Sequence, residues 1–240
     1  SMNSNIIRMD FLSKIFALTE PQAAMVFFDF KAAFPSVLQS FMWEALRHIG
    51  LPERWIALLQ LFYKGNRQQI GDDPSASFFA EVGIRQGCPL SPLLFAAVAD
   101  LLLRKLKRLQ KLSGETRAFA DDTAVAVKSM QHLPAIFQLF EEYATFSNLK
   151  LNIKKTVIVP LFSAGDLATA RASLLALLPA YQDLEITWDA MYLGVRLGPG
   201  SALKGWDPPL KKFAARVEQW SSHGLGAFYE VRLYQVFCFS

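Results

Sequence analysis

Cysteine and long apolar runs are scarce in this chain, and each scarcity excludes a class of protein. Two cysteines among 240 residues, without a CxxC pair, cannot form a disulfide framework, so we expect an intracellular, reducing environment. No uninterrupted apolar run reaches the ~18 residues that a membrane-spanning helix needs, and the first residues carry no apolar core of a signal peptide. The sequence therefore predicts neither a membrane protein nor a secreted one.

Histidine is equally scarce, and the short motifs of several enzyme classes are missing. The three histidines lie far apart, and none has a second His or Cys at ligand spacing, which argues against a zinc site. The chain contains no GxxxxGK[ST], GxSxG or HExxH sequence, so P-loop nucleotidases, α/β-hydrolases and zincin proteases are not indicated. The net charge of +4 is too small to identify an anionic partner by itself.

The apolar fraction of 52% is enough for a large buried core, and strand-like segments are interspersed with helix-like ones. Because they show no regular βαβ order, the predicted fold class is α+β. Strands are expected at residues 25–28, 118–127 and 157–159, with a hairpin from 184–188 to 191–197. Helices are expected at residues 38–49, 53–63, 91–112 (capped by Ser91), 133–148 and 167–178, and beyond Trp206.

Basic side chains gather at the end of the predicted helix 91–112 and just beyond it. This position also suits the helix dipole, because cations are favourable near a helix C-terminus. The cluster is interpreted either as a contact to a nucleic-acid backbone or, by default, as a solvated helix face. Its members are Arg104, Lys105, Lys107, Arg108, Lys111 and Arg117, against the single acid Glu115.

Three aspartates stand where apolar strands end. Asp29 follows strand 25–28, and Asp121 and Asp122 form the tip of a mostly apolar hairpin. Two like charges ~4 Å apart repel by about 4 kcal/mol at an effective dielectric constant near 20, so this pair needs a compensating cation. Mg²⁺ suits it, since Mg²⁺ binds few carboxylates together with phosphate oxygens. If strand 25–28 lies beside the hairpin, the three carboxylates form a candidate two-metal site for phosphoryl transfer; otherwise they are turn or capping residues.

Five short motifs resemble, in the same order, those of reverse transcriptases of the non-LTR (LINE-like) retrotransposon type. FDFKAAF at residues 28–34 resembles the first catalytic motif, and GIRQGCPLSPLLF at 83–95 resembles the second. FADD at 119–122 is similar to the catalytic Asp-Asp turn. LNIKKT at 151–156 resembles the following Asn…Lys-Ser/Thr motif, and YLG at 192–194 resembles the primer-grip hairpin. Five matches in order make coincidence implausible.

The resemblance implies a polymerase palm, in which an antiparallel sheet packs on helices, with partial fingers and a truncated thumb. Residues 1–200 would form the palm with partial fingers, and residues 201–240 the start of the thumb. The implied activity is that of an RNA-directed DNA polymerase with an RNA template, a DNA primer and deoxynucleoside triphosphates as partners, in the nucleus. The alternative is a truncated or repurposed retroelement fragment that binds nucleic acid without catalysis.

The resemblance also assigns roles to residues around the predicted carboxylates. Asp29, Asp121 and Asp122 would bind two Mg²⁺ ions, with Mn²⁺ as an alternative ion. Phe34 would be the bulky gate that excludes a 2′-hydroxyl, or else an ordinary packing residue. The chain departs from the family at Ala32, where the family usually has Lys, and this puts the local geometry beside the triphosphate in doubt.

Further roles fall on the loops and the late hairpin. Gln86 and Gly87 would lie against the nascent base pair, where the absence of a side chain permits close approach. Arg85 would neutralise phosphate or be solvated. Lys155 would contact the triphosphate or protonate the leaving pyrophosphate, or be an ordinary exposed lysine. The hairpin that would position the primer end, or make only a structural contact, consists of Tyr192, Leu193 and Gly194.

Overall fold

The centre of the fold is a five-stranded sheet built around an entirely apolar strand. The computed structural model describes residues 2–69, 77–110, 114–162, 166–203, 207–221, 226, 229, 231 and 232. Neighbouring strands of the sheet are antiparallel, except for β6 and β7, which are parallel. In spatial order the strands are β4 (Gly114–Phe119), β5 (Asp122–Val127), β1 (Ala24–Phe28), β6 (Val157–Pro160) and β7 (Glu185–Ile186).

Strand β1 is apolar throughout because both faces of the sheet are covered at this position. All five of its residues are buried. Val26 pairs with Val125 of β5 on one side and with Ile158 of β6 on the other. A strand buried on both faces loses the alternation of apolar and polar residues, as β1 does.

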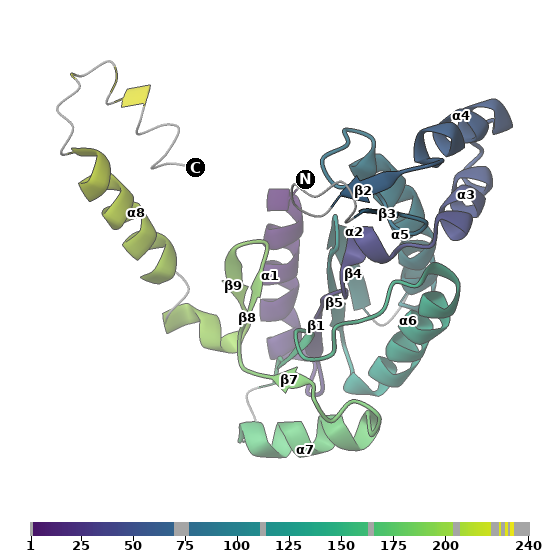
Figure 1. The fold of residues 1–240 in the computed structure, drawn as a ribbon. Coiled ribbons are helices and arrows are strands. Elements are labelled where there is room, and N and C mark those ends of the chain that lie inside the picture. Colours follow the sequence, from purple (N-terminus) through teal and green to yellow (C-terminus); the bar gives the residue numbers. More distant parts are fainter. Residues whose placement is uncertain are drawn as a thin grey trace.

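A layer of helices covers one face of the sheet (Figure 1). Phe28 of β1 stacks on Phe140, with ring centroids 4.3 Å apart. The Tyr143 hydroxyl donates a 2.5 Å hydrogen bond to the Val98 carbonyl, which joins two of the helices. The layer comprises α3 (Gln39–His48), α4 (Glu53–Tyr63), α5 (Ser91–Leu109) and α6 (Leu133–Ser147).

The opposite face is covered by helix α1 (Met2–Thr19) and by the hairpin of β8 (Ala190–Tyr192) and β9 (Val195–Leu197). Met9 and Phe16 of α1 are buried against Met25 and Phe27 of β1. The Phe27 ring also contacts the Tyr192 ring, at a centroid distance of 5.5 Å. Sequence analysis did not predict α1, because its apolar residues are not confined to one stripe.

The remaining elements are short or peripheral. In Figure 1, α8 stands apart from the sheet. No helix in the described part of the chain is long and apolar enough to cross a bilayer. These elements are α2 (Ala33–Ser36), β2 (Arg67–Gln69), β3 (Ser77–Phe79), α7 (Leu167–Leu177), α8 (Asp207–Ser221) and the 3₁₀ segments η1 (Met130–His132) and η2 (Pro199–Leu203).

The α+β class and the helices at 91–112 and 133–148 are confirmed, with three corrections. The predicted hairpin between 184–188 and 191–197 is wrong: β7 joins the main sheet beside β6, and the hairpin is formed by β8 and β9 alone. Ser91 is the first residue of α5 rather than its cap, and its hydroxyl donates to the Arg85 carbonyl. Helix α5 ends at Leu109, and Lys111 lies outside the described residues.

Candidate functional site

The register of the sheet places Asp29 beside Asp122. Phe28 pairs with Thr123, so the next pair beyond the end of β1 consists of these two aspartates. Phe27 and Ala124, which form another pair of this ladder, both face the α1 side of the sheet. Because side chains alternate along a strand, Asp29 and Asp122 follow on that same side. Asp121 precedes β5 in the adjoining turn, so the three carboxylates lie at one end of two central strands.

Negative charge is concentrated here without an internal counter-charge. Burial raises the pKa of Asp122, and the charges of Asp121 and Asp29 raise it further. No lysine or arginine among the described residues forms an ion pair with any of the three. Hard oxygen donors with unbalanced charge fit a divalent cation. The side chains do not form a ready-made ligand cage, however: within the described residues no group of three His, Cys, Asp or Glu is arranged to hold a metal.

The Asp-Asp turn is held in an unusual backbone conformation. Ala120, the residue before Asp121, has a φ of 53°, in the left-handed region that costs a residue with a Cβ atom about 1–2 kcal/mol. Phe119 and Asp122, on either side of the two-residue turn, are the last paired residues of strands β4 and β5. Strain of this kind concentrates at functional sites, where the surrounding structure maintains it.

The motif at residues 151–156 fixes the backbone of Asp29. The Asp29 N–H donates to the Thr156 hydroxyl (3.4 Å), and the Asp29 carbonyl accepts from the Asn152 N–H (2.8 Å). The Thr156 hydroxyl in turn donates to the Asn152 carbonyl (3.0 Å), and Thr156 is fully buried. Asn152 and Thr156 both belong to the predicted Asn…Lys-Ser/Thr motif, but no role for either could be predicted from the sequence. The one sequence signal for this support was the threonine that follows two lysines at the end of the motif.

Phe34 packs against helix α5. Its ring is partly buried and stacks on the Phe95 ring, with centroids 4.5 Å apart and planes inclined by 19°. This contact favours the packing alternative, and the gate role stays a prediction. The Phe34 carbonyl accepts a 2.7 Å hydrogen bond from the Ile84 N–H, and the Gly83 N–H donates to the Val37 carbonyl at 2.8 Å. The second motif is thereby attached to the segment that follows Asp29.

Within that second motif, Arg85 lies against helix α4. Its guanidinium stands over the Tyr63 ring, 5.1 Å from the centroid, and donates to the Phe62 carbonyl. The phosphate role of Arg85 stays a prediction. Gln86 and Gly87 are exposed. No described atom lies within 4 Å of the position that a Cβ atom on Gly87 would take, so this surface is open to a ligand.

The structure brings the β8–β9 hairpin close to the carboxylates. Burial raises the pKa of Tyr192 to about 12, and the negative charge of Asp122 adds to that shift. Leu193 and Gly194 form the two-residue turn, with φ values of 50° and 84°, as a tight hairpin requires. Lys155 is exposed and directly precedes Thr156, which holds the Asp29 backbone. The primer and triphosphate roles of these residues stay predictions.

Comparisons with known protein sequences agree with this geometry. Residues 2–197 match the family model described as reverse transcriptase (RNA-dependent DNA polymerase). The chain is 30% identical, over 138 residues and 55% of its length, to a Retrovirus-related Pol polyprotein from type-2 retrotransposable element R2DM of Drosophila melanogaster. It is 27% identical, over 157 residues and 61% of its length, to a Pol polyprotein from type-1 retrotransposable element R2 of Popillia japonica. The two matches span 13% and 22% of those relatives.

Solved structures with the same arrangement come from telomerases. The telomerase of Candida tropicalis in complex with a TWJ fragment of telomeric RNA superposes with a TM-score of 0.62, at 12% identity, over 99% of this chain and 41% of that one. The apo enzyme truncated from its C-terminal domain gives a TM-score of 0.61, at 14% identity, over 82% and 38%. At these identities the likeness concerns the fold, which is that of a polymerase palm.

Proposed function

The chain belongs to the reverse transcriptase (RNA-dependent DNA polymerase) family, and from this premise we propose that it catalyses RNA-directed DNA synthesis. A primer 3′-hydroxyl attacks the α-phosphate of a deoxynucleoside triphosphate, and pyrophosphate leaves. The observation that carries the proposal is the cross-strand neighbourhood of Asp29 and Asp122, with Asp121 in the adjoining turn. Carboxylates so grouped on a rigid sheet suit the two-metal chemistry of phosphoryl transfer.

Asp29, Asp121 and Asp122 would hold divalent ions, Mg²⁺ or Mn²⁺. When bound, such ions neutralise phosphate oxygens and lower the pKa of the attacking hydroxyl. The support is the hard-oxygen donor set and the mutual repulsion expressed in the raised pKa of Asp122. Hydrogen bonds that join the Asp29 backbone to Thr156 and Asn152 would keep the Asp29 carboxylate at the end of β1.

The surrounding residues would bind the substrates. Phe34, stacked on a rigid helix, would limit the space below the sugar of the incoming nucleotide. Gln86 and Gly87 would face the nascent base pair, while Arg85 anchors their loop to α4. The exposed Lys155 would contact the triphosphate. The hairpin turn near Asp122 would position the primer end.

Template and primer binding would depend mainly on backbone charge, and therefore on salt. We assign residues 1–200 to the palm with partial fingers and residues from 201 onward to the start of a thumb. Figure 1 is consistent with this division, since α8 stands apart from the sheet that bears the carboxylates. The RNA in the telomerase complex named above is a property of that protein, and it supports an RNA partner here only through the shared fold.

Primer extension on an RNA template with Mg²⁺ tests the proposal. The wild-type chain should extend the primer, and Asp121→Asn should abolish extension while retaining affinity for the RNA–DNA duplex. Asp183→Asn is the matched control, because Asp183 is an exposed aspartate that lies outside all five motifs. Failure of the wild-type chain to extend, with duplex binding intact, would instead establish the non-catalytic binder.

A melting experiment tests the metal site without relying on activity. Mg²⁺ that binds only the folded state raises the melting temperature with concentration. This rise should appear for wild type and Asp183→Asn and be reduced for Asp29→Asn. An equal rise in all three proteins would show that the ions bind elsewhere.

A further inference from the structure

A cavity of about 670 Å³ lies in the helix layer, away from the carboxylates. Helices α3, α5 and α6 line it, and these helices pack on the face of the sheet opposite to α1. Asp29 and Asp122 lie on the α1 side. Along α5, the lining begins at Leu101, six residues or about 9 Å beyond Phe95, and ends at Arg108, about 20 Å beyond it at 1.5 Å per residue. The cavity is therefore not part of the proposed polymerase site.

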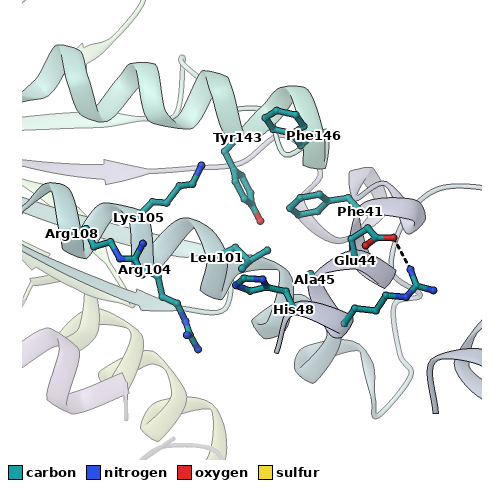
Figure 2. Close-up of a pocket in the computed structure, with 11 residues that line it drawn as sticks. Phe41, Glu44, Ala45, His48, Leu101, Arg104, Lys105, Arg108, Tyr143 and Phe146 are labelled. Carbon is teal, nitrogen blue, oxygen red and sulfur yellow. Dashed lines mark hydrogen bonds and ion pairs between the residues drawn. The ribbon is translucent and has the colours of Figure 1, made fainter. Parts of the chain in front are cut away.

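The lining of this cavity is rich in aromatic rings at one end, where Glu44 and Arg47 also form an ion pair, and is basic at the other end. Figure 2 shows the aromatic rings of α3 and α6 at one end and the basic side chains of α5 at the other. Phe146 is 64% exposed at the rim of the cavity. The apolar residues are Phe41, Ala45, Leu101, Tyr143 and Phe146, and the basic residues are Arg47, His48, Arg104, Lys105 and Arg108.

Two of the cations have no internal partner. Arg104 pairs with Asp100 on its own helix at 2.5 Å. Lys105 and Arg108 form no ion pair with any residue that the structure describes. They are three residues apart and so project from the same side of α5. Both also line an adjoining hollow of about 500 Å³ between α5 and α6, which extends the cavity into a groove and also contains one acid, Glu142, that forms no ion pair with either cation.

We propose that this groove docks an acidic peptide segment of a partner protein, with an apolar side chain in the cavity and carboxylates on Lys105 and Arg108. The combination of an apolar floor and a cationic wall is complementary to an amphipathic segment of opposite charge. A cavity of this volume accommodates one or two large side chains. Because Lys105 and Arg108 line both hollows, the peptide segment can extend along α5 from one hollow into the other.

The same observations disfavour a nucleic acid in this groove. Nucleic-acid binding depends on several phosphate contacts, whereas among the described lysines and arginines of this groove two, Lys105 and Arg108, are without an ion-pair partner. The Tyr143 ring is 5% exposed and packs edge-on against Phe41, which leaves the Phe146 ring at the rim as the largely exposed ring of the lining, whereas single-stranded nucleic acids stack successive bases on several rings.

Selection of displayed random peptides on the full chain tests the proposal. Wild-type protein is the bait in every round, and the enriched peptides are then tested on a Lys105→Glu/Arg108→Glu double variant that takes no part in the selection. Lys107→Glu is the matched control, since it places the same charge change on the same helix but outside the groove. Phe146→Ala tests the apolar end and should fold normally because the ring is largely exposed. Melting curves verify the fold of every variant.

Enriched peptides should carry aspartate or glutamate beside a large apolar residue. They should bind wild type and Lys107→Glu equally, and bind the double variant and Phe146→Ala about tenfold more weakly. Enrichment of sequences without acidic residues, equal binding to the double variant, or no enrichment at all would overturn the proposal. It would also be overturned if a single-stranded RNA oligomer lost affinity for the double variant while the selected peptides did not.

Discussion

Replacing Gly83 by alanine should destabilise the contact between the second motif and the segment that carries Phe34. Gly83 has a φ of 90°, and its N–H donates to the Val37 carbonyl. A Cβ atom at this position would lie 2.5 Å from the Pro35 carbonyl oxygen and 2.9 Å from two further backbone atoms of Pro35. Because the obstacle is backbone rather than a flexible side chain, relief requires one of the two segments to move.

Gly50 provides the matched control for the size of this effect. Its φ is 88°, but no described atom lies within 4 Å of its ideal Cβ position. Alanine should cost about 1–2 kcal/mol at either site for the left-handed conformation. The close approach at Gly83 should add about 1–3 kcal/mol, as overpacking typically does. The entropic effect of replacing glycine on the unfolded chain is common to both variants and cancels in the comparison.

Urea denaturation of the two variants measures the difference. For a chain of this length, each kcal/mol lost from the free energy of unfolding lowers the melting temperature by about 2–4 °C, so thermal melts provide a second measurement. Gly83→Ala should also incorporate nucleotides more slowly than Gly50→Ala at a temperature where both are folded, because Phe34 moves with the displaced segment. Free energies of unfolding that agree within about 0.5 kcal/mol would refute the argument from close approach.

Three further predictions concern the carboxylates and their supports. Thr156→Val should cost about 1–2 kcal/mol and slow primer extension, because the Asp29 N–H loses its acceptor, whereas Thr156→Ser should behave nearly as wild type in both assays. Asp122→Asn should abolish extension yet raise the melting temperature slightly in EDTA, since a carboxylate repelled by Asp121 and Asp29 becomes neutral; a lower melting temperature would contradict this. Burial acts to raise the pKa of Glu115, but the hydrogen bonds from Arg8 and Arg117 outweigh it, so the pKa of Glu115 is lower than 4.5 in the folded state. The ionised Glu115 therefore stabilises the fold above pH 4.5, and this stabilisation is lost as the pH falls through the folded-state pKa. Glu115→Gln should therefore cost about 0.5–1 kcal/mol near neutral pH and nothing in strong acid, and pH-dependent melts that stay parallel to wild type would exclude the effect.

Local patterns predicted the helices and strands whose own residues carry the signal. The apolar stripe of α6 predicted its buried face, and residues 133, 136, 137, 140 and 143 are all buried. The apolar run of β1 likewise predicted a central strand. Helix α1 carries no such stripe and depends on contacts with the sheet, and the two-residue β7 is defined only by its partner β6. Such elements are determined by tertiary packing, which no window of sequence reports.

The candidate site shows the same division. Asp29 and the Asp-Asp turn were recognisable because carboxylates after apolar strands are unusual and because their motifs resemble a known family. The contact of Arg85 with Tyr63 could not be predicted, because Tyr63 lies 22 residues earlier and no residue near Arg85 in the sequence indicates this contact. The role of Thr156 is a hydrogen bond to backbone 127 residues away, which sequence spacing cannot reveal.

The central position of β1 has a consequence for synthesis of the chain. Its two partners, β5 and β6, are translated long after it, so these five apolar residues leave the ribosome with no strand to pair with. Unpaired, uncharged β-prone segments are sites of aggregation during folding. We therefore expect a nascent chain released before residue 160 to be insoluble, and a growing one to need a chaperone until both neighbours have emerged.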